Sequence, residues 1–127
     1  MAGLRDFRDF AAWQRAEELR MLVEEFLARP GLRVRFRRAE QLGDAAASAP
    51  RNIAEGFGRF KPKQFAQFVR IAKGSETEVL NILIEAQKAG LLSSPDFTRY
   101  EICTRRAIGT AVGLIRYLEG ADEPGQE

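Results

Sequence analysis

Residues 48–59 read Ser-Ala-Pro-Arg-Asn-Ile-Ala-Glu-Gly-Phe-Gly-Arg, a stretch with one proline near its start and two glycines near its end. Apolar residues recur at steps of three and four on both sides of Pro50, from Leu42 to Phe57, so one helix face is maintained across the proline. We therefore expect a helix that bends at Pro50, continues, and is capped at Gly56 and Gly58. The proline costs roughly 3 kcal/mol, which packing on both sides must offset.

The same periodicity predicts four helices in one domain that spans residues 1–127. Their expected bounds are about 9–29, 34–57, 62–89 and 95–118, with a disordered tail over 121–127. Asp9 is the expected N-cap of the first helix, Pro62 opens the third, Gly90 ends it, and Ser94-Pro95-Asp96 opens the fourth. Short connections and the lack of any strand signal predict an all-α fold, an up-down-up-down four-helix bundle with its second helix kinked at the proline.

The third predicted helix carries more apolar surface than one neighbouring helix covers. Its apolar arc, from Phe65 to Ala86, takes up roughly half of the circumference at about 100° per residue. We therefore expect identical copies to share this surface in a ring-forming homo-oligomer. Glu76 projects into the arc, where an unpaired carboxylate is costly, so we expect it to pair with an arginine or to lie at a subunit seam. Small residues over 45–49 predict tight packing on the third helix, with Ala46 opposite Gly74.

Composition excludes several classes of chemistry. The 127 residues contain no histidine and a single cysteine, Cys103. Histidine catalysis and the Glu-x-x-His di-iron sites of helical bundles are therefore impossible, and an internal disulfide cannot form. Gly56 and Gly58 follow a helix and lack the lysine and hydroxyl residue of a phosphate-binding loop. No apolar run is long enough to span a bilayer. We expect a cytoplasmic protein that is not an enzyme and has no cofactor, no metal and no membrane contact.

Positive charge is concentrated in the middle of the chain. The net charge is +2 overall, but residues 31–73 carry ten basic and three acidic side chains, a local charge of +7. Such a block suggests a local anionic partner. The candidate nucleic-acid-binding residues are Arg33, Arg35, Arg37, Arg38, Arg51, Arg59, Lys61, Lys63, Arg70 and Lys73.

These cations do not form one patch in the predicted bundle. Those near Arg33 and those near Lys61 lie at opposite ends of the second helix, about 36 Å apart at 1.5 Å per residue. In a ring each set would repeat around one rim, and Phe36, Phe57 and Phe60 could stack on bases. The alternative is a solvated rim of arginines whose phenylalanines belong to the core.

Asn52 and Glu55 form the most distinctive polar pair of the chain. Because Pro50 frees a carbonyl, Asn52 can bond to it or to a neighbouring group, and Glu55 can pair with Arg59 four residues later. We favour this structural role, with Pro50, Asn52, Glu55, Gly56 and Gly58 as one structural motif. The alternative is a polar ligand pocket made by Asn52, Glu55 and Arg59.

Four segments resemble one known family. They are residues 9–16 (DFAAWQRA), 48–59 (SAPRNIAEGFGR), 65–75 (FAQFVRIAKGS) and 86–91 (AQKAGL). The chain is similar here to the small four-helix-bundle proteins encoded within intervening sequences of bacterial 23S ribosomal RNA genes. The resemblance implies a homopentamer, related in architecture to accessory proteins of diversity-generating retroelements, which bind nucleic acid and a reverse transcriptase. Gly43-Asp44, where two arginines are usual, and Glu76, where a small or apolar residue is usual, depart from the family pattern.

Together these observations predict a non-enzymatic, homo-oligomeric helical bundle. We expect its basic surface to bind RNA, DNA or a nucleic-acid-associated protein such as a nucleic-acid enzyme. The alternative function is a protein assembly scaffold that does not bind nucleic acid.

Overall fold

The computed structural model describes residues 6–120, which form six helical elements and no strand within that range. The predicted tail over 121–127 lies outside the described residues. The elements are the 3₁₀ helix η1 (Phe7–Asp9) and the α-helices α1 (Ala11–Leu27), α2 (Leu32–Arg35), α3 (Ala39–Phe57), α4 (Pro62–Lys88) and α5 (Ser94–Glu119).

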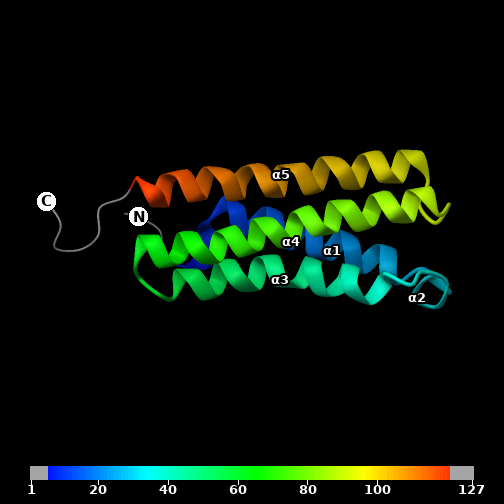
Figure 1. Cartoon of the computed structure of the whole chain (residues 1–127), viewed down its shortest axis with the longest axis horizontal. Coiled ribbons are helices and arrows are strands. Elements are labelled where there is room, and N and C mark those ends of the chain that lie inside the picture. The colour runs from blue at the N-terminus through cyan, green and yellow to red at the C-terminus, as the bar shows by residue number, and fades with distance from the viewer. Residues whose placement is uncertain (1–5, 121–127) are drawn as a thin grey trace, which may run out of the picture.

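The four long helices lie side by side and alternate in direction (Figure 1). α1 packs against α3 and α5, and α4 packs against the same two helices, so α1 and α4 occupy diagonal positions. The all-α prediction is confirmed, and the long helices match the four predicted segments. None of the helices between residues 6 and 120 combines the length and apolar character that a membrane span requires.

The helix predicted from residue 34 is in fact two helices. The chain leaves α2 at Phe36, whose backbone is extended with φ −109° and ψ 110°, and α3 begins only at Ala39. Leu32 and Phe36 are both buried in the core cluster beneath this end of the bundle. α2 is thus a separate helical turn over the end of the core, and the extended Phe36 ends it.

The predicted cap of the first helix is also wrong. Asp9 belongs to η1, where its carboxylate accepts from the Asp6 N–H at 3.1 Å while Asp6 caps the same element. α1 begins after Phe10, which makes no side-chain cap bond but is buried. The aromatic side chain therefore positions the start of α1 by packing.

The ends of α4 and α5 lie close to the predicted positions. Pro62 is the first residue of α4, and Gly90, with φ +76°, follows its end while Leu91 N–H bonds the Ala86 carbonyl at 3.0 Å. α5 begins one residue before the predicted start and is capped by Ser93, whose hydroxyl accepts from the Asp96 N–H at 3.2 Å. The predicted cap, Ser94, is the first residue of the helix.

α3 continues through Pro50, as predicted, and its apolar stripe is buried on both sides of the proline. Its register on α4 differs from the prediction. The hydroxyl oxygens of Ser48 on α3 and Ser75 on α4 lie 2.9 Å apart. Gly74, in contrast, is exposed, and a Cβ added there would meet nothing within 4 Å. The prediction that Ala46 faces Gly74 is therefore wrong by about one helical turn.

The glycine that close packing requires is Gly56. A Cβ at this position would lie 2.7 Å from Phe68 Cβ and 2.8 Å from Phe65 Cδ1, so α3 and α4 approach closely only because Gly56 has no side chain. The predicted glycine cap is confirmed at Gly58, which is the C-cap of α3 and bonds the Ala54 carbonyl at 3.3 Å through its N–H, and is wrong at Gly56, which lies within α3. The left-handed residue of this turn is Phe60, with φ 58°.

One protomer covers the apolar arc of α4. Most arc residues from Phe65 to Ala86 are buried against α3 and α5, Phe68 and Ser75 are partly buried, and of the large apolar side chains on this helix only Ile71 is more than half exposed, at 52%. The inference that surplus surface on this helix requires a second copy is therefore wrong.

Glu76 lies inside the core of the single chain and not at a seam. It is 0% exposed, and neither carboxylate oxygen has a hydrogen-bond partner within the described part of the chain. The expected arginine partner is absent from that part, so both predictions for Glu76 are wrong. Burial raises its pKa to about 8, because water is replaced by apolar surroundings that disfavour the charged form.

Glu76 separates two apolar clusters. Val79 and the residues after it on α4 pack in the cluster beneath α2, while Ala72 and the residues before it pack in the cluster at the opposite end. The boundary falls at small side chains on two other helices as well, between Ala46 and Ala49 on α3 and between Ala107 and Ala111 on α5. The middle of the bundle, between the two clusters, is thus lined largely by alanine, which leaves room for one long side chain.

Candidate nucleic-acid interface

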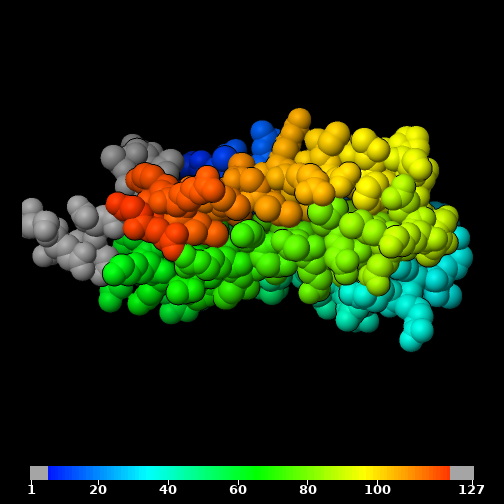
Figure 2. Space-filling view, turned by 45° about the horizontal axis from the view of Figure 1, so that its top comes forward, coloured from blue at the N-terminus to red at the C-terminus, as the bar shows by residue number. Residues whose placement is uncertain are grey.

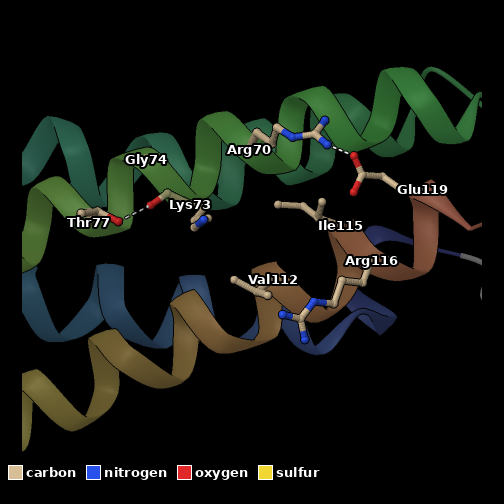
Figure 3. Close-up of a pocket in the computed structure, with 8 residues that line it drawn as sticks. All are labelled: Arg70, Lys73, Gly74, Thr77, Val112, Ile115, Arg116 and Glu119. Carbon is tan, nitrogen blue, oxygen red and sulfur yellow. Dashed lines mark hydrogen bonds and ion pairs between the residues drawn. The ribbon is translucent and has the colours of Figure 1, made fainter.

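A groove runs between the exposed sides of α4 and α5, whose surfaces lie next to each other along the molecule (Figure 2). It contains a cavity of ≈ 440 Å³ to which both helices contribute side chains (Figure 3). The lining residues are Arg70, Lys73, Gly74, Thr77, Val112, Ile115, Arg116 and Glu119. Val112 and Ile115 supply apolar surface, and the remaining long side chains are charged.

A second cavity of ≈ 400 Å³ extends the groove towards the start of α4 and is lined by Lys63, Ala66, Gln67, Arg70 and Glu119. The two cavities share Arg70 and Glu119, whose side chains point towards each other and form an ion pair (Figure 3). This pair therefore marks the boundary between the two parts of one groove.

Helical spacing explains why the cations converge. Lys63, Arg70 and Lys73 are separated by seven and three residues, so they lie along one side of α4 over about 15 Å at 1.5 Å per residue. Arg116 comes from the last turns of α5, which runs antiparallel to α4. Among residues 6–120, the side chains of Lys63, Lys73 and Arg116 have no ion-pair or hydrogen-bond partner, and Glu119 is the sole carboxylate lining the groove. The groove therefore carries an excess of positive charge.

The α3–α4 turn leads directly into this groove. Phe60 is 76% exposed at its tip, with Arg59 and Lys61 on either side in the sequence. Arg59 is held by Glu55 at 2.9 Å and lies 5.0 Å from the centre of the Phe68 ring. Lys61 is exposed and precedes the first residue of α4. Of the three phenylalanines predicted to stack on bases, Phe36 is buried and Phe57 packs in the core, so only Phe60 is accessible.

The other predicted cations lie elsewhere. Arg33, Arg35 and Arg37 are exposed around α2, at the far end of the bundle, and Arg33 makes only a loose 3.8 Å contact with Glu24. Arg38 is engaged by both carboxylate oxygens of Glu85, at 2.8 and 3.1 Å.

Arg51 is exposed on α3. The prediction that the basic residues form separate sets at opposite ends of the bundle is confirmed. Only Lys63, Arg70 and Lys73 of the predicted set meet in the groove.

Asn52 and Glu55 have the structural contacts predicted for them. The Asn52 amide donates to the Ser48 carbonyl at 2.8 Å and to the Ser48 hydroxyl at 2.9 Å, and Glu55 pairs with Arg59. Neither of the two groove cavities includes Asn52, Glu55 or Arg59. Asn52 bonds within α3, and Glu55 pairs with Arg59 just beyond the end of this helix, which favours the structural role over the ligand pocket.

The single cysteine, Cys103, is partly buried on α5. Burial and the nearby Glu18 raise the pKa of the Cys103 thiol, which keeps it in the protonated, weakly nucleophilic form. Within residues 6–120, no three His, Cys, Asp or Glu side chains are placed to hold a metal ion.

Two charged residues of the groove were not among the sequence candidates. Arg116 and Glu119 lie in the C-terminal part of the chain, where acidic residues outnumber basic ones, so its composition gave no indication of a basic site. The only sequence signal is their separation by three residues, which places both near one side of α5. Their position opposite Arg70 depends on how α5 packs against α4.

Comparison with known sequences places this bundle in a family. The model described as 23S rRNA-intervening sequence protein matches residues 8–108. The chain belongs to this family. Among 23S rRNA-intervening sequence proteins it is thus matched from η1 into the middle of α5, while Arg116 and Glu119 lie beyond the matched residues. Comparison with curated proteins finds no match.

Proposed function

We propose that this 23S rRNA-intervening sequence protein is a non-enzymatic bundle that binds the phosphate backbone of RNA or DNA in the α4–α5 groove. The observation that supports this proposal is the convergence of Lys63, Arg70, Lys73 and Arg116 on one groove with a single carboxylate. Lysine and arginine bind phosphates by neutralising their charge and releasing counterions. Three of these four cations have no partner among the described residues, so binding a phosphate breaks no existing ion pair at those positions.

Salt dependence tests the proposal directly. Fluorescence anisotropy of a labelled 20-nucleotide RNA, titrated with protein at 50 and 200 mM salt, measures affinity and salt slope together. Three to four phosphate contacts predict a loss of affinity of roughly 20- to 50-fold between the two salt concentrations. The double variant Lys73→Ala, Arg116→Ala is expected to bind more weakly and with a smaller slope.

Arg106→Ala is the matched control. Arg106 is exposed on α5, as Arg116 is. Its charge affects the pKa of the Cys103 thiol, and so do the charges of Glu18 and Arg15 on α1. Arg106 therefore lies on the side of α5 that faces α1. Its removal is expected to leave binding nearly unchanged. If the wild-type protein binds no nucleic acid at 50 mM salt, the proposal is wrong, and the alternative of an assembly scaffold is favoured.

We also propose that the protein associates with itself. Gly109 and Gly113 lie inside α5 with nothing within 4 Å of an added Cβ, and Ile102 and Tyr117 on the same helix are about half exposed. Glycine weakens a helix interior, and no contact among the described residues compensates, so we attribute these two glycines to the close approach of a helix from another copy. Light scattering coupled to gel filtration tests this, and a 14.3 kDa monomer at all concentrations contradicts it.

A further inference from the structure

Phe60 combines two unfavourable features that packing does not explain. It is the only residue other than glycine with positive φ in the described part of the chain, and a bulky side chain in this left-handed region is strained. The residue is also 76% exposed to water. Glycine at this position would relieve the backbone strain and remove the exposed apolar surface.

The surrounding turn holds the ring in place. The Phe60 N–H bonds the Phe57 carbonyl at 3.4 Å, and the two rings lie 6.5 Å apart with a tilt of 55°. Phe57 is anchored in turn by edge contacts with Phe10 and Phe65, at 5.6 and 6.1 Å. Phe60 is thus an exposed ring attached to a fixed aromatic cluster.

The charges beside Phe60 favour a polyanionic ligand. Lys61 follows it directly, and Lys63 opens the basic groove three residues later. Neither lysine has a carboxylate partner in the portion of the chain that the structure covers. An exposed ring at the end of a cationic groove matches the arrangement by which proteins bind single strands, where phosphates follow the groove and bases stack on aromatic side chains.

We propose that Phe60 is a stacking platform for an unpaired base, and that the ligand of the groove is therefore a single-stranded nucleic acid. This inference rests on the proposed function. Within a duplex the faces of the internal bases are covered by their neighbours, so the ring can stack only at an end. A single strand with its phosphates along Lys63 to Lys73 can place one base on Phe60.

The test compares three substitutions at one position. Phe60→Leu keeps apolar bulk but removes the aromatic face, Phe60→Trp keeps the face, and Phe60→Gly removes the ring while fitting the backbone. Phe60→Leu and Phe60→Gly are expected to lose about 5- to 150-fold in affinity for single-stranded RNA, the range that loss of one stacked base gives. Their salt slope should not change, because no phosphate contact is lost. Phe60→Trp should keep the affinity, and its fluorescence should be quenched on binding beyond any change from Trp13 in the wild type.

Duplex RNA of the same sequence is the ligand control, and thermal melting is the folding control. We expect Phe60→Gly to melt no lower than the wild type, so that weaker binding cannot be attributed to unfolding. Equal losses for single strand and duplex, or no loss in Phe60→Leu while Lys73→Ala, Arg116→Ala weakens binding, would overturn the stacking role and leave the groove intact. If no form of the protein binds RNA, the proposed function fails and the stacking role with it.

Discussion

Ser75 of α4 donates a hydrogen bond to the hydroxyl oxygen of Ser48 on α3, at 2.9 Å. The same oxygen accepts from the Asn52 amide, also at 2.9 Å, and this amide reaches the Ser48 carbonyl at 2.8 Å. The three side chains thus link α3 to α4 next to Pro50, which lies midway between Ser48 and Asn52 in the sequence. The link stabilises the helix where the proline removes a backbone donor, and it favours one register between the two helices.

Asn52→Ala is therefore expected to lower the free energy of unfolding by about 1 to 2 kcal/mol, because the Ser48 groups lose a half-buried donor. Urea denaturation followed by circular dichroism measures the change. Asn81→Ala is the control, since Asn81 is exposed on α4. An equal and small effect at both positions would show that the link contributes little.

The contrast between Gly56 and Gly74 gives a second prediction. Gly56→Ala should destabilise the protein by about 1 to 3 kcal/mol, because the new methyl group would overlap Phe65 and Phe68. Gly74→Ala should stabilise it by roughly 0.5 to 1 kcal/mol, since alanine favours the helix and the added methyl group points into open space. Thermal melting of both variants checks the signs, and a stabilised Gly56→Ala variant would contradict the close approach of α3 and α4.

Glu76 makes stability depend on pH. Its pKa is raised from 4.5 to about 8 in the folded protein, so the folded state holds its proton more tightly than the unfolded state does. The resulting stability is fully present below pH 4.5 and is lost progressively as the pH rises through 8. We expect the free energy of unfolding to fall by on the order of a few kcal/mol between pH 5 and pH 8.5.

The variant Glu76→Gln should remove most of that pH dependence and should be more stable than the wild type at pH 8.5. Urea denaturation at both pH values measures the effect. Glu78→Gln, an exposed neighbour on α4, should retain the wild-type slope. A wild-type stability that is constant across this range would mean that Glu76 is solvated or paired.

The Arg70–Glu119 ion pair predicts an effect on binding. Glu119→Gln frees Arg70 and removes the one carboxylate from the groove, so RNA should bind more tightly by about 2- to 5-fold, the size of an exposed ion pair. Anisotropy titration at 50 mM salt measures this. Glu101→Gln is the control, because Glu101 pairs with Arg105 elsewhere on α5. The gain should disappear when Arg70→Ala is added; a gain that persists would reflect general charge repulsion.

Local signals in the sequence identified most of the fold. Pro62 and Gly90 bound α4 because each has a backbone preference that acts on its own, and the apolar spacing defines which face is buried. The break at Phe36 could not be found in this way, because arginines and a valine on either side fit a helix equally well. What ends α2 is the burial of Phe36 over the end of the core, which depends on helices that are distant in sequence.

In the candidate site, too, local sequence signals show some features, and others depend on how the helices pack. The cations of α4 were found from charge density, but their pairing with α5 required the register of two antiparallel helices. Glu76 was misread because the sequence marks it as a polar residue in an apolar arc without showing that the facing residues are alanines. The small side chains around Glu76 leave room for its carboxyl group. Burial raises the pKa of this group, which favours the neutral form that needs no arginine partner.

The order of the helices around the bundle has a consequence for synthesis on the ribosome. α3 and α4 are consecutive and can pair as a hairpin as soon as both have emerged. α1 also packs against α5, which follows α4 in the chain, and until α5 has left the exit tunnel one flank of α1 remains without its neighbour. The ring of Phe26, which lies 6.0 Å from that of Tyr100 in α5, therefore lacks this partner until α5 emerges, and chaperones can bind such an uncovered apolar side chain.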